Sequence, residues 1–377
     1  MLKSLKLRVI LVLIFLVVSI VFCLPNVVEM KGVWKRYLPS DKIHLGLDLK
    51  GGMHLLLEMD TSKMMENVLD RKFSNFKDAM IRDGIRFLGL SKKENGISVV
   101  IRPEQKDKLY NLAGKEFTDF KAGGQKTEGE NLVVDFIFSE KDMNHLRENA
   151  VNQALETIRN RIDQFGVTEP VIVKQGDNQI LVQLPGIKDP QRALELIGRT
   201  AQLEFKLVDE ENAARYTGGP VPDGDEVLSL KIRNRETGIV TTAPILLKKQ
   251  ALLTGELLTD ARVKIGGEFN NEPYVAIEFN AEGSRIFDKI TAENVGKRIA
   301  IILDNTVYSA PVVKERISGG KASITGGFTM DEAKDLAIVL RAGALPAPVK
   351  VVQNITIGPT LGQDSIRKGV SAAIMGA

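Results

Sequence analysis

The sequence predicts an α+β protein that is anchored in a membrane by one N-terminal helix. Three observations support this prediction. Residues 9–24 carry no charge and follow a basic N-terminus, residues 65–138 and 146–208 repeat one order of helices and strands, and residues 209–325 are rich in strands. A chain of 377 residues is long enough for two or three domains.

The composition excludes several classes of protein. Charged residues make up 26% and hydrophobic residues 44% of the chain, as in ordinary folded proteins. A net charge of +3 gives no indication of a nucleic-acid partner. The one cysteine, Cys23, lies in the hydrophobic segment, so neither an intrachain disulfide nor a thiol metal site is expected.

The N-terminal hydrophobic segment predicts an uncleaved anchor rather than a signal peptide. The stretch SIVFCLPN offers no small residues for cleavage, and Phe22 is too bulky for lipoprotein processing at Cys23. Residues 9–24 span ~24 Å as a helix, and the membrane helix extends over 9–28 when flanking apolar residues join it.

The basic side chains before this segment orient it. They place residues 1–8 in the cytoplasm, because positive charge is retained on that side. Residues 29–42 are then a linker, and the bulk of the chain lies outside the cytoplasm.

The repeat predicts the architecture of the first domain. Residues 146–165 form an amphipathic helix that ends at Gly166, followed by a hairpin, a short helix capped by Asp189 and the strand 201–208. Residues 65–138 show the same order, with a Gly-rich loop before the last strand. This split βαβ order is typical of a ferredoxin-like layer. Chance similarity between two α+β stretches is the alternative.

The stretch LGLDLKGGMHLLLEMD, residues 45–60, is expected to start that domain as a strand over 43–50. Gly51 and Gly52 interrupt the alternation. One interpretation is an edge strand with a bulge. The other is a junction that needs glycine for close packing.

A second domain is expected as an insertion. We predict a base domain from residues 43–208 and 326–357 and an inserted α+β head over 209–325, which contains one helix near 283–291 and a hairpin RIAIILDNTVYSAPVV. Thr329 and Glu332 form a capping box that opens the next helix. Hinges between head and base are expected at four residues: Val208, Asp209, Gly326 and Gly327.

The C-terminal segment 358–377 ends in a short apolar run. Either it is a tail of small residues, or it is the truncated start of a second membrane helix; we expect the second.

Enzyme motifs are not found in the sequence. It contains no P-loop, no G-x-S-x-G and no H-E-x-x-H, and its three histidines are scattered. We therefore predict no catalytic, cofactor-binding or metal-ligating residue, no cofactor, and a protein that is not an enzyme.

Four short elements remain: GLDLKGG, DNTVYSAPVV, LRAGALPAPV and GPTLGQDSI. Their candidate functional and structural residues are Gly46, Asp48, Lys50, Gly51, Gly52, Arg341, Gly343, Leu345, Pro346, Gly358, Pro359, Leu361 and Gly362.

With RNRIDQFGVTEP and LVQLPG, these elements occur in the order found in the SecD family, which the chain resembles over essentially its whole length. The resemblance implies an inner-membrane protein with a periplasmic base and a mobile head. It implies an accessory role in proton-motive-force-driven export, in which the head binds the emerging preprotein and prevents backsliding. It implies no nucleotide, and it places the proton-carrying residues in membrane helices beyond residue 377.

The partners implied by the resemblance are SecF, the SecYEG channel, YajC, YidC, unfolded preproteins and the membrane, without nucleic acid. The alternative function is the periplasmic porter-like part of a related RND-type efflux transporter. That alternative calls for an aromatic-lined pocket, whereas only 6% of residues are aromatic and they are not clustered in the sequence. A signal-anchored envelope hydrolase is a third alternative.

Asp48 and Lys50 are expected to hold the junction between membrane and base. Asp48→Ala should therefore impair either secretion of a reporter preprotein or folding of the base. Normal secretion together with an unchanged unfolding curve would contradict this.

Overall fold

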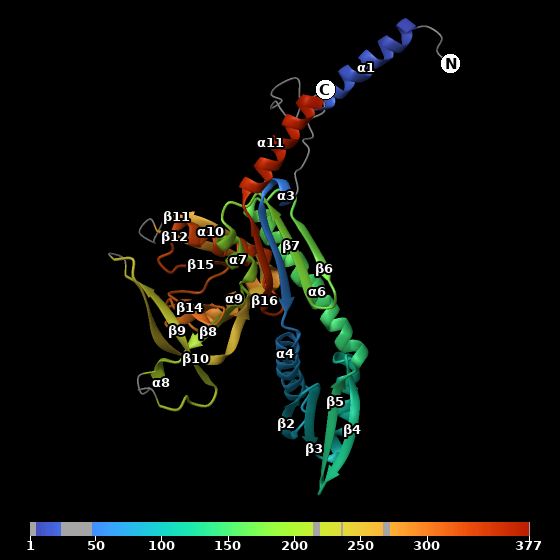
Figure 1. The fold of residues 1–377 in the computed structure, drawn as a ribbon. Coiled ribbons are helices and arrows are strands. Elements are labelled where there is room, and N and C mark those ends of the chain that lie inside the picture. Colours follow the sequence, from blue (N-terminus) through green and yellow to red (C-terminus); the bar gives the residue numbers. More distant parts are fainter. Residues whose placement is uncertain (1–4, 24–46, 214–218, 235–236, 267–271, 377) are drawn as a thin grey trace. The chain divides into compact units, whose positions relative to one another are not determined.

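The computed structural model describes residues 5–23, 47–213, 219–234, 237–266 and 272–376. They belong to two compact units, Met1–Gly52 with Ile357–Ala377, and Met53–Thr356 (Figure 1).

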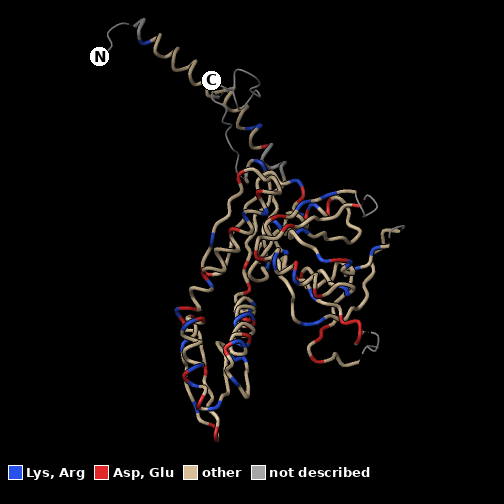
Figure 2. Tube along the Cα trace, turned by 180° about the vertical axis from the view of Figure 1, so that it is seen from behind, with Lys and Arg blue, Asp and Glu red and all other residues tan. Residues whose placement is uncertain are grey.

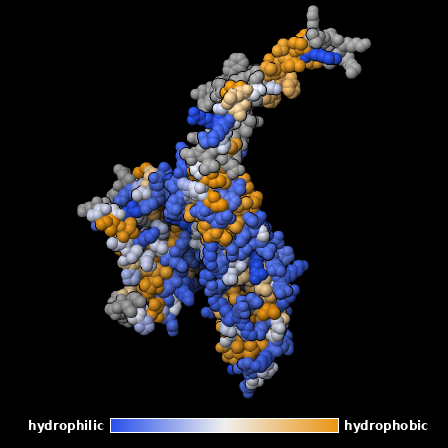
Figure 3. Space-filling view, viewed as in Figure 1, coloured by the Kyte–Doolittle hydropathy of each residue, from blue (hydrophilic) through white to orange (hydrophobic). Residues whose placement is uncertain are grey.

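The first unit contains three helices in its described part: α1 (Leu5–Cys23), α3 (Leu47–Lys50) and α11 (Pro359–Gly376). The short α3 lies against α11. Apolar side chains cover most of α1, as the orange surface in Figure 3 shows. Among the residues that the structure describes, no helix combines the length and apolarity that crossing a membrane requires.

The prediction of a strand over 43–50 is wrong for residues 47–50, the part of this segment that the structure describes. Residues 47–50 form a single helical turn, and the strand β1 (Gly52–Met59) begins only at the second glycine. Gly51 and Gly52 have φ values of +67° and +143°, so the chain reverses its course there in a conformation that other residues rarely adopt. Residues 43–46 lie outside the described residues.

A four-stranded sheet, called here the base sheet, has the strand order β16-β1-β7-β6. Two helices, α6 and α7, bury apolar side chains against it in one core. Strand β1 alternates strictly, with Met53, Leu55, Leu57 and Met59 buried. The other elements are β6 (Val171–Gln175), β7 (Gln179–Pro185), β16 (Val349–Ile357), α6 (Glu140–Phe165) and α7 (Pro190–Gly198).

A second sheet has the order β2-β3-β5-β4 and is antiparallel throughout. Its core is aromatic, and the ring centroids of Phe76 and Phe117 lie 4.8 Å apart. The elements are α4 (Thr61–Arg82), β2 (Phe87–Lys93), β3 (Gly96–Ile101), η2 (Pro103–Gln105), α5 (Lys106–Glu116), β4 (Phe120–Glu128) and β5 (Asn131–Phe138).

The predicted repeat is present in its helix–strand–strand–helix part, whereas its last strand, 201–208, lies in the head barrel. The helix–strand–strand–helix run α4-β2-β3-α5 corresponds to α6-β6-β7-α7, and in each sheet two further strands complete the order. In the second sheet these are β5 and β4, and in the base sheet they are β1 and β16. Residues 120–128, expected as a loop, are the strand β4, because their backbone pairs with β5 around a bulge at Gly123.

The second unit also contains a head, formed by residues 203–342. Five strands close a barrel in the order β10-β8-β13-β14-β9, and three more form the head sheet β11-β12-β15. The barrel strands are β8 (Leu203–Val208), β9 (Asp225–Arg233), β10 (Val240–Thr254), β13 (Ile299–Leu303) and β14 (Thr306–Ser309). The remaining elements are α8 (Glu210–Ala213), η3 (Gly255–Leu257), β11 (Leu258–Ile265), β12 (Pro273–Phe279), α9 (Ala281–Glu293), β15 (Lys321–Ile324) and α10 (Met330–Ala342).

The boundaries of the head differ from the expected 209–325. Strand β8, expected in the base, pairs with β10 and β13 inside the barrel. Helix α10, opened by the predicted capping box, packs its buried face on the head sheet. Both elements belong to the head because their apolar side chains share its core. The head sequence is therefore longer at each end than its composition indicates.

Removing the Phe76 side chain should destabilise the second sheet strongly. The ring is fully buried among three other phenylalanines, so Phe76→Ala should lower the free energy of unfolding by about 3–5 kcal/mol. Urea titration followed by circular dichroism measures this. Ile81→Ala on the same helix, where the side chain is 60% exposed, should change stability by less than about 0.5 kcal/mol. Equal effects of the two changes would contradict the assignment of the core.

Candidate functional site

The first motif, GLDLKGG, lies at the boundary between the two units. Gly51 and Gly52 are buried, and Gly52 is the first residue of β1, while Asp48 and Lys50 belong to α3. Gly46 and the side chain of Asp48 lie outside the described part of the structure. The motif is therefore a turn from a short helix into the central part of a sheet, which accounts for its glycines.

The second motif, LRAGALPAPV, ends α10 and leads into the base sheet. Arg341 Nε donates to Asp260 Oδ1 at 3.0 Å, which ties the last turn of α10 to β11. Gly343 has φ +92° and caps the helix. Leu345 is buried, and its backbone N–H donates to the carbonyl of Thr200 at 2.8 Å. The half-buried Pro346 follows it in the crossing to the base.

The third motif, GPTLGQDSI, lies where β16 gives way to α11. Gly358 separates the strand from the helix, and Pro359 is the first helical residue, a position that tolerates a missing N–H. Leu361 and Gly362 lie in the first turns of α11, with side chains outside the described part. The glycine and proline of this motif thus mark the start of a helix.

The residues expected as hinges lie within ordered parts of the head. The N–H groups of Val208 and Asp209 donate to the carbonyls of Arg298 and Leu246, so this point is part of the barrel. Gly326 closely approaches Phe328, and an added Cβ there would lie 3.1 Å from the ring. Gly327 has φ +62°. Close packing and a turn account for these glycines.

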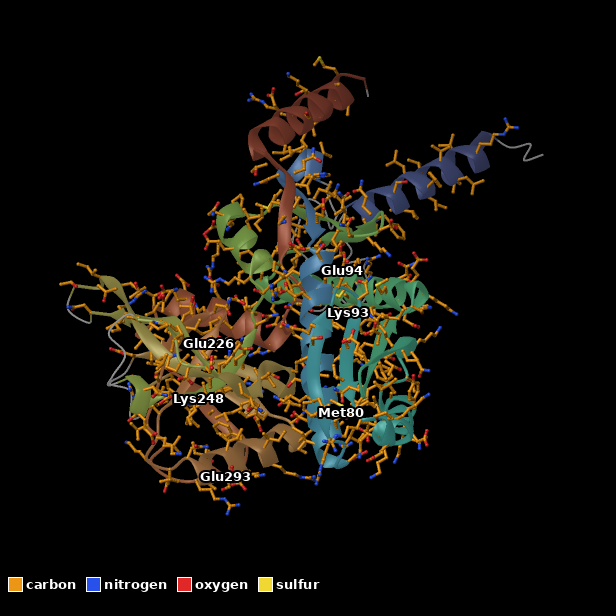
Figure 4. The ribbon with its side chains drawn as sticks, turned by 90° about the horizontal axis from the view of Figure 1, so that it is seen from below. Met80, Lys93, Glu94, Glu226, Lys248 and Glu293 are labelled. Atoms are coloured by element: carbon orange, nitrogen blue, oxygen red, sulfur yellow. The ribbon has the colours of Figure 1, made fainter. Side chains whose placement is uncertain are left out.

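A charged cluster fixes the segment that follows β8. The buried Asp209 carboxylate accepts from the backbone N–H of Asn212 at 3.0 Å and from Lys248, whose Nζ also lies 2.9 Å from Asp225. The Asn212 N–H first, and then Lys248, hold the pKa of Asp209 well below its usual range. The hydrogen bond to Asp209 likewise raises the pKa of Lys248. Figure 4 labels Lys248 of this cluster and Glu226, which follows Asp225. In Figure 2 the red acidic positions lie close together on the segment that follows β8.

The buried side chain of Arg161 was not identified as a site residue from sequence. It projects from α6 and is 1% exposed. Its Nη1 donates to the carbonyls of Leu196 and Ile197 at 2.9 and 3.1 Å, and its Nη2 donates to Gly343 at 3.0 Å. A signal was present, because Arg161 follows Ile158 by three residues on the apolar stripe of the helix.

Burial lowers the pKa of Arg161 to about 10, which leaves the guanidinium charged at neutral pH. Two helix ends surround this cation, since α7 ends at Gly198 and α10 ends at Ala342. Carbonyl groups at helix C-termini lack intrahelical partners and carry partial negative charge. The Arg161 guanidinium is therefore a buried cation that is held by backbone carbonyl groups.

A groove opens on the head between the end of β9 and the segment that follows β15. Its larger part has a volume of about 520 Å³ and is lined by Lys231, Arg233, Tyr274 and Phe328 among others. A smaller hollow of about 120 Å³ shares Lys231, Arg233 and Phe328 and adds Tyr308. The groove thus joins aromatic faces, cationic side chains and the backbone of two glycines.

The charges in the groove are partly compensated. Arg233 Nη2 lies 2.6 Å from Glu332 Oε1, and Lys231 Nζ lies 4.9 Å from the centroid of the Tyr308 ring. Arg199 adds a further cationic side chain to the smaller hollow. This surface suits peptide carbonyls and apolar or aromatic side chains better than one defined small molecule.

The expectation that aromatic residues do not cluster is wrong. Five phenylalanines contact one another in the second core: Phe76, Phe117, Phe120, Phe136 and Phe138. They are buried, however, and they fill a core rather than line a binding pocket.

Comparisons with known proteins agree with the resemblance seen in the sequence. Residues 37–63 match the family model described as the SecD/SecF GG motif, residues 151–210 match the N-terminal part of the P1 domain of protein translocase subunit SecDF, and residues 230–347 match the SecDF P1 head subdomain. The head model extends to 347, past α10.

The relatives cover nearly the whole chain. Protein translocase subunit SecD of Syntrophobacter fumaroxidans is 48% identical over 379 residues, which is 99% of this chain and 71% of that protein. The chain belongs to the SecD family. SecD of Calditerrivibrio nitroreducens is also 48% identical, over 99% of this chain and 70% of its own length.

A solved structure supports the same assignment. The crystal structure of SecDF in the super-membrane-facing form is 30% identical, with a TM-score of 0.50, over 98% of this chain and 38% of that chain. The present chain thus spans well under half of that SecDF polypeptide. SecD and SecDF matches do not favour the efflux alternative.

The Asp209 cluster should make the head sensitive to acid. Because the folded-state pKa is depressed, this carboxylate stabilises the fold fully above the ordinary value of about 3.9, and the stabilisation is lost progressively as the pH falls below that value toward the lower folded-state pKa. Asp209→Asn should therefore be less stable than the parent at pH 7, with a difference that shrinks at pH 3. Urea unfolding midpoints at the two pH values measure it. Asp78→Asn, at an exposed position of α4, is the control, and a pH-independent difference for Asp209→Asn would contradict the assignment.

Proposed function

We propose that this chain is the SecD-like part of a Sec accessory complex that assists proton-motive-force-driven export of preproteins across the bacterial inner membrane. The observation that carries the proposal is 48% identity to SecD over 99% of the chain. In this role the protein binds an emerging chain and prevents it from sliding back. It uses no cofactor and is not an enzyme.

The proposed location is the inner membrane, with residues 1–8 in the cytoplasm and the main domain in the periplasm. The apolar run of α1 supports residues 9–28 as the anchor, since most of its side chains from Val9 to Val18 are uncovered within its unit. The proposed partners are SecF, the SecYEG channel, YajC, YidC, unfolded preproteins and the membrane.

We further infer that the base is ferredoxin-like. In the base sheet the strands occur along the chain as β1, β6, β7 and β16, and their spatial order places the fourth beside the first and the third beside the second. This is the order of a split βαβ layer with α6 and α7 as its two helices. The second sheet matches this order when β5 takes the place of β1 and β4 the place of β16, so the two layers differ in where along the chain these strands occur.

The head groove is the surface that we assign to the preprotein. An unfolded chain offers peptide carbonyls and varied side chains. Tyr274 and Tyr308 are half-buried and offer ring surface, and Lys231 offers a cation, so the contacts tolerate many sequences. Phe328 is buried and packs against Tyr308 beneath them.

A site-specific crosslink tests this function. A photoreactive residue at Ile232, an exposed position in the groove, should crosslink to a preprotein arrested during export in membranes. The same residue at Lys289, exposed on α9, should not. When the arrest is released and export is completed before irradiation, the Ile232 product should not form.

Two results would contradict the assignment of the groove. One is equal crosslinking from both positions, which indicates nonspecific proximity. The other is no product at Ile232 while export depends on the protein, which moves the binding surface elsewhere.

A further inference from the structure

The chain passes between base and head twice. It leaves α7 at Gly198 and enters the head at Leu203, and it leaves α10 at Ala342 and returns to the base at Val349. These two segments, 199–202 and 343–348, are called here the crossings. Any change in the orientation of the head has to be accommodated by backbone rotation in both.

Arg161 of the base holds both crossings with one side chain. Its Nη1 donates to the carbonyl of Arg199 in the first crossing, and its Nη2 donates to the carbonyl of Gly343 in the second, at 3.0 Å. The guanidinium plane fixes the angle between these donors, so the two carbonyls are held in one relative position.

The cost of moving either crossing is set by burial. Arg161 is 1% exposed, and its partners in the described structure are backbone carbonyls rather than a carboxylate. Its Nε already lacks a hydrogen-bond partner among the described residues. A second crossing that moves away leaves the buried Nη2 without its carbonyl partner, and a first crossing that moves away leaves Nη1 with the two carbonyls of α7 only. Displacement of the crossings from this arrangement is therefore opposed.

Three further hydrogen bonds tie the crossings to each other and to the head. The backbone carbonyl of Thr200 accepts from the N–H of Leu345 at 2.8 Å, and the Thr200 hydroxyl donates to Asp304 at 2.6 Å. Asp304 also accepts from the N–H of Gln202 at 3.0 Å. Asp304 and Asn305 have φ values of 48° and 60°, the conformation of a tight turn between β13 and β14. The first crossing is thus held from the base side by Arg161 and from the head side by Asp304.

We propose that Arg161 is a positioning residue that sets the orientation of the head by holding both crossings at once. The consequence for export rests on the proposed function. The orientation of the head does not, since it is measurable without a preprotein. It replaces the hinges expected at 208–209 and 326–327, which lie within the head.

Distances between spin labels test the inference in the full protein in detergent or membranes. With Cys23→Ser as background, labels at Lys174 on β6 and Lys289 on α9 report base-to-head separation, because both positions are exposed. We expect one narrow distribution in the parent. Arg161→Lys keeps the charge but cannot reach all four carbonyls, so a second population of at least a tenth of the molecules should appear.

Arg159→Lys, exposed on the same helix, is the matched control and should leave the distribution unchanged. Thr200→Val removes the hydroxyl that donates to Asp304 and keeps the backbone, and it should broaden the distribution while leaving the protein folded even if the Arg161 variant does not fold. Circular dichroism establishes which variants are folded. An unchanged distribution in Thr200→Val, or in folded Arg161→Lys, overturns the inference, even when the melting temperature falls.

Secretion measured in parallel separates this inference from the proposed function. A second population with slower secretion supports both. A second population with normal secretion supports the positioning role and contradicts the use of head orientation in export. An unchanged distribution with slower secretion contradicts the positioning role and leaves the export function standing.

Discussion

One buried guanidinium connects the parts of the second unit. Arg161 lies on the apolar face of α6, where an uncompensated cation costs several kcal/mol. The cost is offset by the C-terminal carbonyls of α7 and the carbonyl that follows α10, so both helices must end where they do. The base sheet, through α7, and the head, through α10, are therefore arranged around this side chain. An ammonium group with three donors cannot substitute for this planar fork.

The base is a single layer interrupted by two insertions. The second sheet is inserted between β1 and α6, and the head is inserted between α7 and β16. Helices α4 and α6 each contribute side chains to both the base core and the second core, with Met65 and Val68 packed against both. This sharing joins the two sheets, and the head is joined to the base by the crossings, by Leu196 and Phe165, which pack in the head core, and by contacts such as Arg192 with Asp335 at 2.7 Å.

The groove and the crossings give the head two separate properties. The groove combines ring faces, a cation and glycine backbone, which suits an extended polypeptide of variable sequence. The crossings connect the head that carries this groove to the base, and Arg161 holds both of them. Arg199 belongs to both, since its carbonyl accepts from Arg161 and its side chain lines the smaller hollow. A bound chain in contact with the Arg199 side chain would therefore act on the same residue whose backbone carbonyl Arg161 holds.

Local patterns in the sequence determined a large part of this protein. Periodicity and capping residues located α4, α6, α9, α10 and the hairpin β13–β14, because helix stripes, the Thr329–Glu332 capping box and a tight turn are set by residues close in the chain. The ordered set of motifs also identified the SecD family. Tertiary structure alone decided that β8 belongs to the barrel, that β4 is a strand, that residues 47–50 are helical and that Arg161 is buried. The placement of β8 and the burial of Arg161 depend on partners far along the chain, since β8 pairs with β10 and β13 and Arg161 donates to Gly343, 182 residues away. Strand β4 depends on pairing with the adjacent β5.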